Sequence, residues 1–219
     1  QLSAIGWTSA LPGGKTLSHS INNGSYTLLR FQKEMKLLPA ETIKREVDKK
    51  CADIEKEQER YATKKEKEMF KEDAIFTLLP QAFSKYKSTY VYLDNIHELI
   101  VIDTASRSEA EDILALLRKC LGTLPVRTYF NGEALQNCLN GWLTQEHEVP
   151  EAFEIGDAVK ISSWEEGGAI ASFKNEEIFD KRITSLVVDD GRDVNYLSLA
   201  FDGALSLQLD TEGTLRNIK

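Results

Sequence analysis

The chain has 219 residues, of which 42% are hydrophobic and 28% are charged, and this balance excludes a wholly disordered protein. Its formal net charge of −8 argues at first sight against a nucleic-acid partner. No apolar stretch approaches the roughly 20 residues that a membrane-spanning helix needs, so we expect a cytosolic protein with no membrane partner.

The acidic residues are concentrated towards the C-terminal end of the chain. Residues 144–219 contain 16 acidic and 7 basic residues, whereas residues 1–143 contain 19 acidic and 20 basic residues. The net charges of these two segments are therefore −9 and +1. A basic surface can form in the first two thirds of the chain if folding sorts the charged side chains by face.

The chain begins with turns, followed by residues typical of a strand. Residues 10–24 are rich in glycine, asparagine and proline, which predicts irregular structure. Asn23 and Gly24 favour a tight turn, and the apolar residues after them predict a strand over 25–33. Pro39 marks the boundary of the next segment.

Residues 40–73 lack proline and glycine and contain 11 acidic and 10 basic residues. Their few apolar residues recur at helical spacing, which predicts a narrow apolar stripe with solvated flanks. The segment is compatible with one continuous helix. The pattern from Thr63 to Glu66 also matches a capping box, in which case one helix ends near Tyr61 and a second begins there. The segment is thus predicted to be a helical arm rather than a core helix.

Residues 74–143 are predicted to alternate between strands and helices. Pro80 ends or kinks the helix that precedes it. Apolar runs predict three strands, at 90–93, 99–103 and 126–130. Amphipathic spacing predicts two helices, one from Ser106 to Gly122 and one over 133–143. A second capping box, Ser106 to Glu109, opens the first of these helices.

Beyond Pro150 the sequence consists of short strand-like runs separated by turns that contain glycine. Four strands are expected, at 169–173, 186–188, 196–201 and 205–209. One short helix is expected near 175–181. The predicted fold is α+β, with a mixed central region, a projecting charged arm and a C-terminal antiparallel meander. The central region would comprise residues 1–39 and 74–143, the arm or tip 40–73, and a strand-rich base 144–219.

The sequence contains no motif that predicts an enzyme. Gly13–Thr16 matches the end of a phosphate-binding loop, but Ser9 stands where that loop needs a glycine. None of the three histidines belongs to a zinc-binding H-E-x-x-H helix. The Asp189–Asp193 cluster is explained by a turn between strands, with a magnesium-dependent nuclease as a distant alternative. We expect no catalytic residue, no cofactor and no metal.

Five motifs occur in a characteristic order along the chain. They are Gly6-Trp7, Leu37–Pro39, Leu78–Ser84, Ala115–Lys119 and Gly122–Pro125. Together they resemble the RdgC family, the recombination-associated proteins of proteobacteria. The resemblance covers essentially the whole chain and is strongest from Leu78 to Pro125. Members of that family have more chain at both ends, so the sequence is interpreted as a fragment.

The resemblance implies a nucleoid-associated DNA-binding protein that is not an enzyme. Family members form a ring-shaped homodimer around double-stranded DNA, bind it without marked sequence preference, and restrain RecA-promoted recombination. Single-stranded DNA is a further expected ligand. The positive lining of the ring would carry over to matching basic residues, namely Lys33, Lys36, Arg60, Lys64 and Lys85. Gln81 departs from the family pattern, in which a basic residue is common at that position.

The charged arm allows two hypotheses. Its basic residues include Lys64, Lys65, Lys67 and Lys71, which could follow DNA phosphates without reading the base sequence. The same composition is typical of a solvated helix with ion pairs along its surface. In that alternative the protein is an interaction domain whose arm pairs with another helix and never touches DNA. The two hypotheses differ in whether the basic residues gather on one surface.

Phe83 also has two interpretations. Pro80 forces a change of chain direction three residues earlier, at the base of the arm. Phe83 is then either a core aromatic or, in a ring that closes through a second subunit, an exposed anchor at the dimer contact. We expect the dimer contact.

Overall fold

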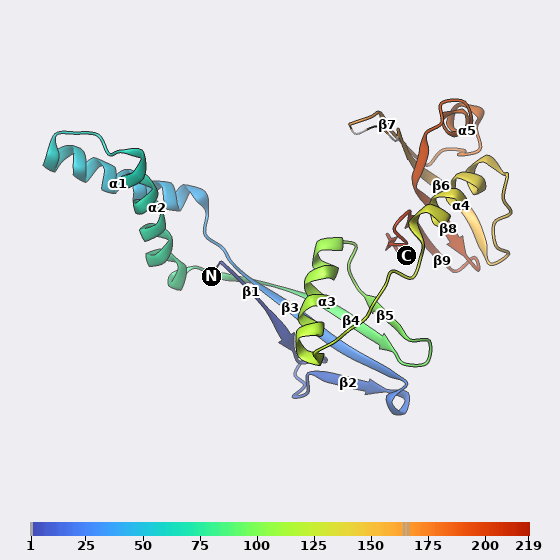
Figure 1. Cartoon of the computed structure of the whole chain (residues 1–219), viewed down its shortest axis with the longest axis horizontal. Coiled ribbons are helices and arrows are strands. Elements are labelled where there is room, and N and C mark those ends of the chain that lie inside the picture. Colours follow the sequence, from blue (N-terminus) through green and yellow to red (C-terminus); the bar gives the residue numbers. More distant parts are fainter. Residues whose placement is uncertain (1, 164, 166) are drawn as a thin grey trace. The chain divides into compact units, whose positions relative to one another are not determined.

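The computed structural model describes residues 2–163, 165 and 167–219 and divides the chain into two compact units, Gln1–Gly122 and Thr123–Lys219 (Figure 1). Each unit has its own antiparallel sheet and its own hydrophobic core. The predicted α+β class is confirmed, whereas the three-region division stays a prediction. A membrane-crossing helix is absent from the described residues, because none of their helices combines the necessary length and apolar character.

The first unit is built on a five-stranded sheet. Its strands are β1 (Ser3–Thr8), β2 (Ser18–Ile21), β3 (Tyr26–Lys36), β4 (Ser84–Asp94) and β5 (Leu99–Ile102). β3 pairs with β1 and β2 along one edge and with β4 along the other, and β5 pairs with β4. The prediction of irregular structure over 10–24 was wrong at β2, a polar four-residue strand that pairs with the more apolar β3.

Helix α3 (Arg107–Leu121) covers one face of this sheet (Figure 1). Alternate strand residues point towards the helix, and among them Phe31 and Val91 are fully buried against Ile113 of α3. Trp7 meets Phe31 edge to face, with the ring centroids 6.1 Å apart. This apolar cluster is the core of the first unit.

A buried carboxylate ties α3 to the sheet. Glu109 is 8% exposed and accepts hydrogen bonds from three side chains, Lys87 Nζ at 2.6 Å, Thr89 Oγ1 at 3.1 Å and Thr104 Oγ1 at 2.5 Å. Burial by itself raises the pKa of Glu109, but the ammonium and hydroxyl donors outweigh burial and hold the pKa below its ordinary value. The carboxylate is therefore ionised at neutral pH.

The second capping box forms only in part. The Ser106 hydroxyl accepts from the Glu109 amide at 3.4 Å, as predicted, so Ser106 caps the helix. The Ser106 amide, however, donates to Thr104 Oγ1 at 3.2 Å, while the Glu109 carboxylate is turned towards the sheet. This carboxylate turns away from Ser106 because Lys87 and Thr89 of β4 and Thr104 of the loop after β5 offer it three donors at once.

The helical arm breaks where the sequence predicted. Helix α1 (Ala40–Gln58) ends before the break, and α2 (Lys64–Leu78) begins after it. The capping box is complete, since Thr63 Oγ1 accepts from the Glu66 amide at 3.3 Å and Glu66 Oε2 accepts from the Thr63 amide at 2.8 Å. A single 3-10 turn, η2 (Leu79–Gln81), contains Pro80 and leads into β4.

The second unit has an antiparallel sheet with two helices against its core. The strand order is β10 (Leu215–Arg216), β9 (Leu205–Asp210), β8 (Asp193–Phe201), β6 (Phe153–Ser162) and β7 (Ile170–Lys174). Helices α4 (Gly132–Thr144) and α5 (Lys181–Val188) contribute Leu139 and Ile183 to a core that also contains Ile161 and Leu197, all fully buried. The strands β8, β9 and β10 follow one another as the expected meander.

Three predictions of local structure in this unit were wrong. Residues 186–188 belong to α5, where Leu186 and Val187 pack with Ile183 against the core instead of extending as a strand. The helix expected near 175–181 starts only at Lys181, because the Asp180 carboxylate caps the Arg182 amide at 2.8 Å. Residues 126–130 form no strand. Phe130 instead lies against Gly213, where an added Cβ would approach its ring to 2.3 Å.

Removing the Glu109 carboxylate should destabilise the first unit. We expect Glu109→Ala to lower the free energy of unfolding by about 1–3 kcal/mol, because the buried Thr89 hydroxyl loses its acceptor. Urea unfolding at pH 7 measures this difference, with Glu111→Ala, an exposed position on the same helix, as a control that should change it by less than about 0.5 kcal/mol.

The same comparison has a predicted pH dependence. A carboxyl with a lowered pKa in the folded state contributes stability above its unfolded pKa of about 4.3, and the contribution is lost as pH falls through the folded pKa. The difference between wild type and Glu109→Ala should therefore shrink in acid. A difference that is absent at pH 7, or that grows on acidification, would contradict the assigned role of Glu109.

Candidate nucleic-acid interface

Four predicted DNA-binding lysines lie on α2 and are available to a ligand. Lys64, Lys65, Lys67 and Lys71 are exposed, and none of them forms an ion pair with another described residue. The spacing of Lys64, Lys67 and Lys71 places these three on one side of the helix. An exposed ammonium without a carboxylate partner keeps its full charge available to a phosphate.

Other basic residues of the arm are already paired. Arg60 Nη2 and Nη1 bind the two oxygens of Glu66 at 2.7 and 2.9 Å, a bidentate contact across the turn between α1 and α2. This contact, together with the bonds from Thr63, holds the pKa of Glu66 well below its ordinary range. Lys50 on α1 pairs with Asp73 on α2. Arg60 therefore holds the turn, and its role as a DNA contact stays a prediction.

The first sheet places its three predicted lysines on two different faces. By strand alternation, Lys33 and Lys85 lie on the side that α3 covers, where Lys33 Nζ is 3.7 Å from Asp112 of that helix. Lys36 lies on the opposite side, with its Nζ 3.7 Å from Glu34. The structure thus brings the lysines of α2 together but does not gather all the predicted residues on one surface.

The opposite side of the sheet, here called the open face, carries residues that the sequence reasoning missed. It is formed by alternate residues of β3 and β4, including Tyr26, Arg30, Lys36, Tyr86, Ser88, Tyr90 and Tyr92. The Arg30 guanidinium donates to Ser88 Oγ at 3.0 Å and lies 6.0 Å from the centre of the Tyr90 ring. The alternation of tyrosines along β4 is the signal that could have identified this face.

Aromatic side chains at the base of the arm are open to solvent. Phe83 is 84% exposed and is connected to the strand before the arm by its carbonyl, which accepts from the Leu37 amide at 2.7 Å. Within α2, Phe76 is 80% and Met69 57% exposed, seven residues apart on one side of the helix. The core interpretation of Phe83 does not fit this exposure, and the dimer contact stays a prediction. Phe76 was not singled out from the sequence.

The acidic cluster considered for a nuclease has structural partners. Asp190 pairs with Arg192 at 3.0 Å, and Asp193 accepts a hydrogen bond from Asn140 Nδ2 at 2.9 Å. Among residues 2–163, 165 and 167–219, no three or more His, Cys, Asp or Glu side chains come close enough to hold a metal ion. Gln81, at the position where the family pattern has a basic residue, lies exposed in η2.

Comparison with known proteins gives one family over residues 1–219, described as "Putative exonuclease, RdgC". A protein from Colwellia psychrerythraea is 38% identical over the whole chain, which spans 70% of that relative. Proteins from Proteus mirabilis and Shewanella frigidimarina are 35% and 34% identical, and the chain spans 71% of each. All three are named "Recombination-associated protein RdgC". The chain belongs to the RdgC family.

Proposed function

We propose that this protein binds double-stranded DNA without marked sequence preference, as a ring-shaped homodimer that restrains RecA-promoted recombination. The observation that carries DNA binding is a set of four exposed lysines on α2 that form no ion pair with another described residue, Lys64, Lys65, Lys67 and Lys71. A role in recombination is supported by the name of the relatives. DNA binding would place the protein at the nucleoid. Single-stranded DNA offers the lysines of α2 the same phosphates as double-stranded DNA.

The distribution of charge supports DNA binding by the first unit. Residues 1–122 contain 19 basic and 18 acidic residues, whereas residues 123–219 contain 8 basic and 17 acidic residues. Several carboxylates of the first unit are bound to specific cations, as Glu66 is to Arg60 and Glu109 to Lys87. These carboxylates are engaged by cations other than the lysines of α2. The second unit carries a net charge that repels phosphate.

The remaining predicted contacts are assigned as secondary. Lys85 is exposed and forms no ion pair with another described residue, so it can reach a phosphate directly. Lys33, Lys36 and Arg60 would have to share their charge with the carboxylates that they already contact. Arg30 on the open face joins this set, because its guanidinium bonds to a hydroxyl rather than to a carboxylate.

We assign the protein to DNA binding rather than to DNA cleavage. The family description names an exonuclease, whereas the names of the relatives refer to recombination. Two acidic side chains of the Asp189–Asp193 cluster, Asp190 and Asp193, are engaged by Arg192 and Asn140. Binding by lysines alone requires no catalytic group.

Affinity for duplex DNA should be independent of sequence and steeply dependent on salt. Each phosphate contact contributes about −0.9 to the slope of log K against log salt, so six contacts would cost roughly a thousandfold between 50 and 200 mM. Gel shifts with duplexes of unrelated sequence measure both properties. A strong preference for one duplex, an affinity insensitive to salt, or shortening of the DNA when magnesium is added would contradict the proposal.

Charge reversal on α2 should weaken DNA binding without unfolding the arm. We expect the change of Lys64, Lys65, Lys67 and Lys71 to Glu to lower affinity more than about a hundredfold, because four phosphate contacts are replaced by repulsion. Two of the reversals fall in the first turn, where acidic residues favour a helix. Reversal of four second-unit cations, Arg127, Lys160, Lys181 and Lys219, is the control of equal charge change. Equal losses from both sets would mean that net charge alone governs binding.

Replacing Phe83 should affect self-association and leave stability unchanged. Because this side chain is 84% exposed, we expect Phe83→Ala to alter the free energy of unfolding by less than about 0.5 kcal/mol and to weaken dimerisation about tenfold or more. Phe31→Ala, in the core, should instead cost about 3–5 kcal/mol. Thermal melting and analytical ultracentrifugation of both variants measure these effects. Unchanged association of Phe83→Ala would remove this residue from the dimer contact.

A further inference from the structure

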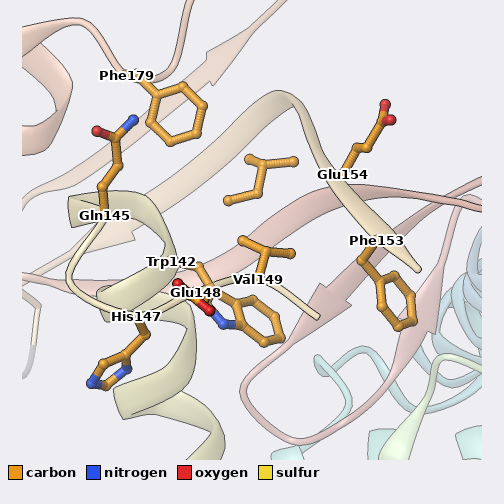
Figure 2. Close-up of a pocket in the computed structure, with 9 residues that line it drawn as sticks. Trp142, Gln145, His147, Glu148, Val149, Phe153, Glu154 and Phe179 are labelled. Carbon is orange, nitrogen blue, oxygen red and sulfur yellow. The ribbon is translucent and has the colours of Figure 1, made fainter. Parts of the chain in front are cut away.

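The second unit contains an apolar hollow that the proposed DNA-binding function does not use. Its cavity volume is about 450 Å³, within the range of small binding sites. Its apolar lining consists of Trp142, Val149, Phe153, Ile155 and Phe179. Figure 2 shows the side chains of Trp142, Val149, Phe153 and Phe179 arranged around a common space. A hollow of this size accepts one or two apolar side chains.

The hollow is a consequence of how the chain leaves α4. Gln145 adopts a left-handed conformation with φ of 63°, and the next two amides return to the carbonyl of Gly141 at 2.9 and 3.1 Å. The ring of His147 lies against Gly141, where an added Cβ would be 2.2 Å from Nδ1. The chain then continues into β6. Phe179, 41% exposed, closes the other side, beside the buried Ile178.

Two carboxylates line this apolar hollow. The segment 145–154 contains four glutamates and no lysine or arginine, and two of the four, Glu148 and Glu154, line the hollow. Neither of these two forms an ion pair with another residue that the structure describes. Lys181 and Arg182 follow Phe179 in the sequence but do not line the hollow, and Arg182 pairs with Glu176 and Asp180. The rim is therefore acidic.

We propose that this hollow binds a basic segment of a partner protein, with an apolar side chain inserted between lysines or arginines. Burial of that side chain against Trp142 and Phe153 would supply the affinity, since removing apolar surface from water is favourable. Glu148 and Glu154 would pair with the flanking cations and set the orientation. The same carboxylates repel DNA phosphates, and the net charge of −9 on residues 123–219 disfavours the corresponding surface of a second copy.

The test uses a fluorescein-labelled peptide that has one phenylalanine flanked by arginines. Fluorescence anisotropy measures binding of this peptide to the full chain. Two control peptides replace the phenylalanine by serine or the arginines by glutamate. Glu148→Lys with Glu154→Lys removes the acidic rim, and Phe179→Ser removes an exposed part of the apolar wall. Glu57→Lys with Glu68→Lys, two exposed positions on the arm, is the control with the same charge change. Melting temperatures verify that each variant is folded. If Glu148→Lys with Glu154→Lys is not folded, Glu148→Gln with Glu154→Gln takes its place.

The proposal predicts that the peptide binds and that both control peptides bind at least about tenfold more weakly. It also predicts that each change in the hollow weakens binding by a similar factor, whereas the arm control leaves it unchanged. Affinity for DNA should be unchanged in Phe179→Ser and should not fall in Glu148→Lys with Glu154→Lys, so the failure of one proposal does not imply failure of the other. Absence of peptide binding, equal binding of the serine peptide, or equal losses in the arm control would overturn the proposal. Sedimentation that shows self-association lost with Glu148→Lys and Glu154→Lys would assign the hollow to a second copy and overturn it as well.

Discussion

The carboxylate of Glu66 determines the shape of the arm. It accepts hydrogen bonds from the amide and the hydroxyl of Thr63, both at 2.8 Å, and from the Arg60 guanidinium at 2.7 and 2.9 Å. These contacts fix the residue at which α2 begins after the turn that follows α1. Because the pKa of Glu66 lies well below its ordinary range, the carboxylate keeps its charge throughout the neutral and mildly acidic range. The lysines of α2 are thereby presented on an ordered helix.

The basic residues of the first unit divide into two groups with different physical roles. One group forms ion pairs with carboxylates of the same unit, as Arg60 does with Glu66, Lys50 with Asp73 and Lys87 with Glu109. The other group, on α2, has no such partner among the described residues and remains available to a polyanion. Composition alone does not distinguish these groups, so a near-neutral net charge is compatible with a locally basic surface.

The parts of the fold that short-range chemistry controls were predictable from the sequence. The spacing of Thr63 and Glu66 was sufficient to locate the break in the arm, since both partners of a capping box lie within one turn. Which side of the sheet is covered, at Lys33, and which is open, at Lys36, was not predictable, because it depends on the packing of α3, which lies far along the chain from β3. Strand β6 was not predicted, because Gly156 and several polar residues interrupt its apolar pattern. The hollow is lined by both Trp142 and Phe179, residues far apart in the sequence, an arrangement that no local pattern contains.

The proposed DNA binding depends on contacts between the lysines of α2 and DNA phosphates. The most direct test compares the slope of log K against log salt for wild type and for a variant with Lys64, Lys65, Lys67 and Lys71 changed to Gln. Four lost phosphate contacts should reduce the magnitude of the slope by about 3–4. A slope that stays the same, whatever the change in affinity at one salt concentration, would contradict the claim.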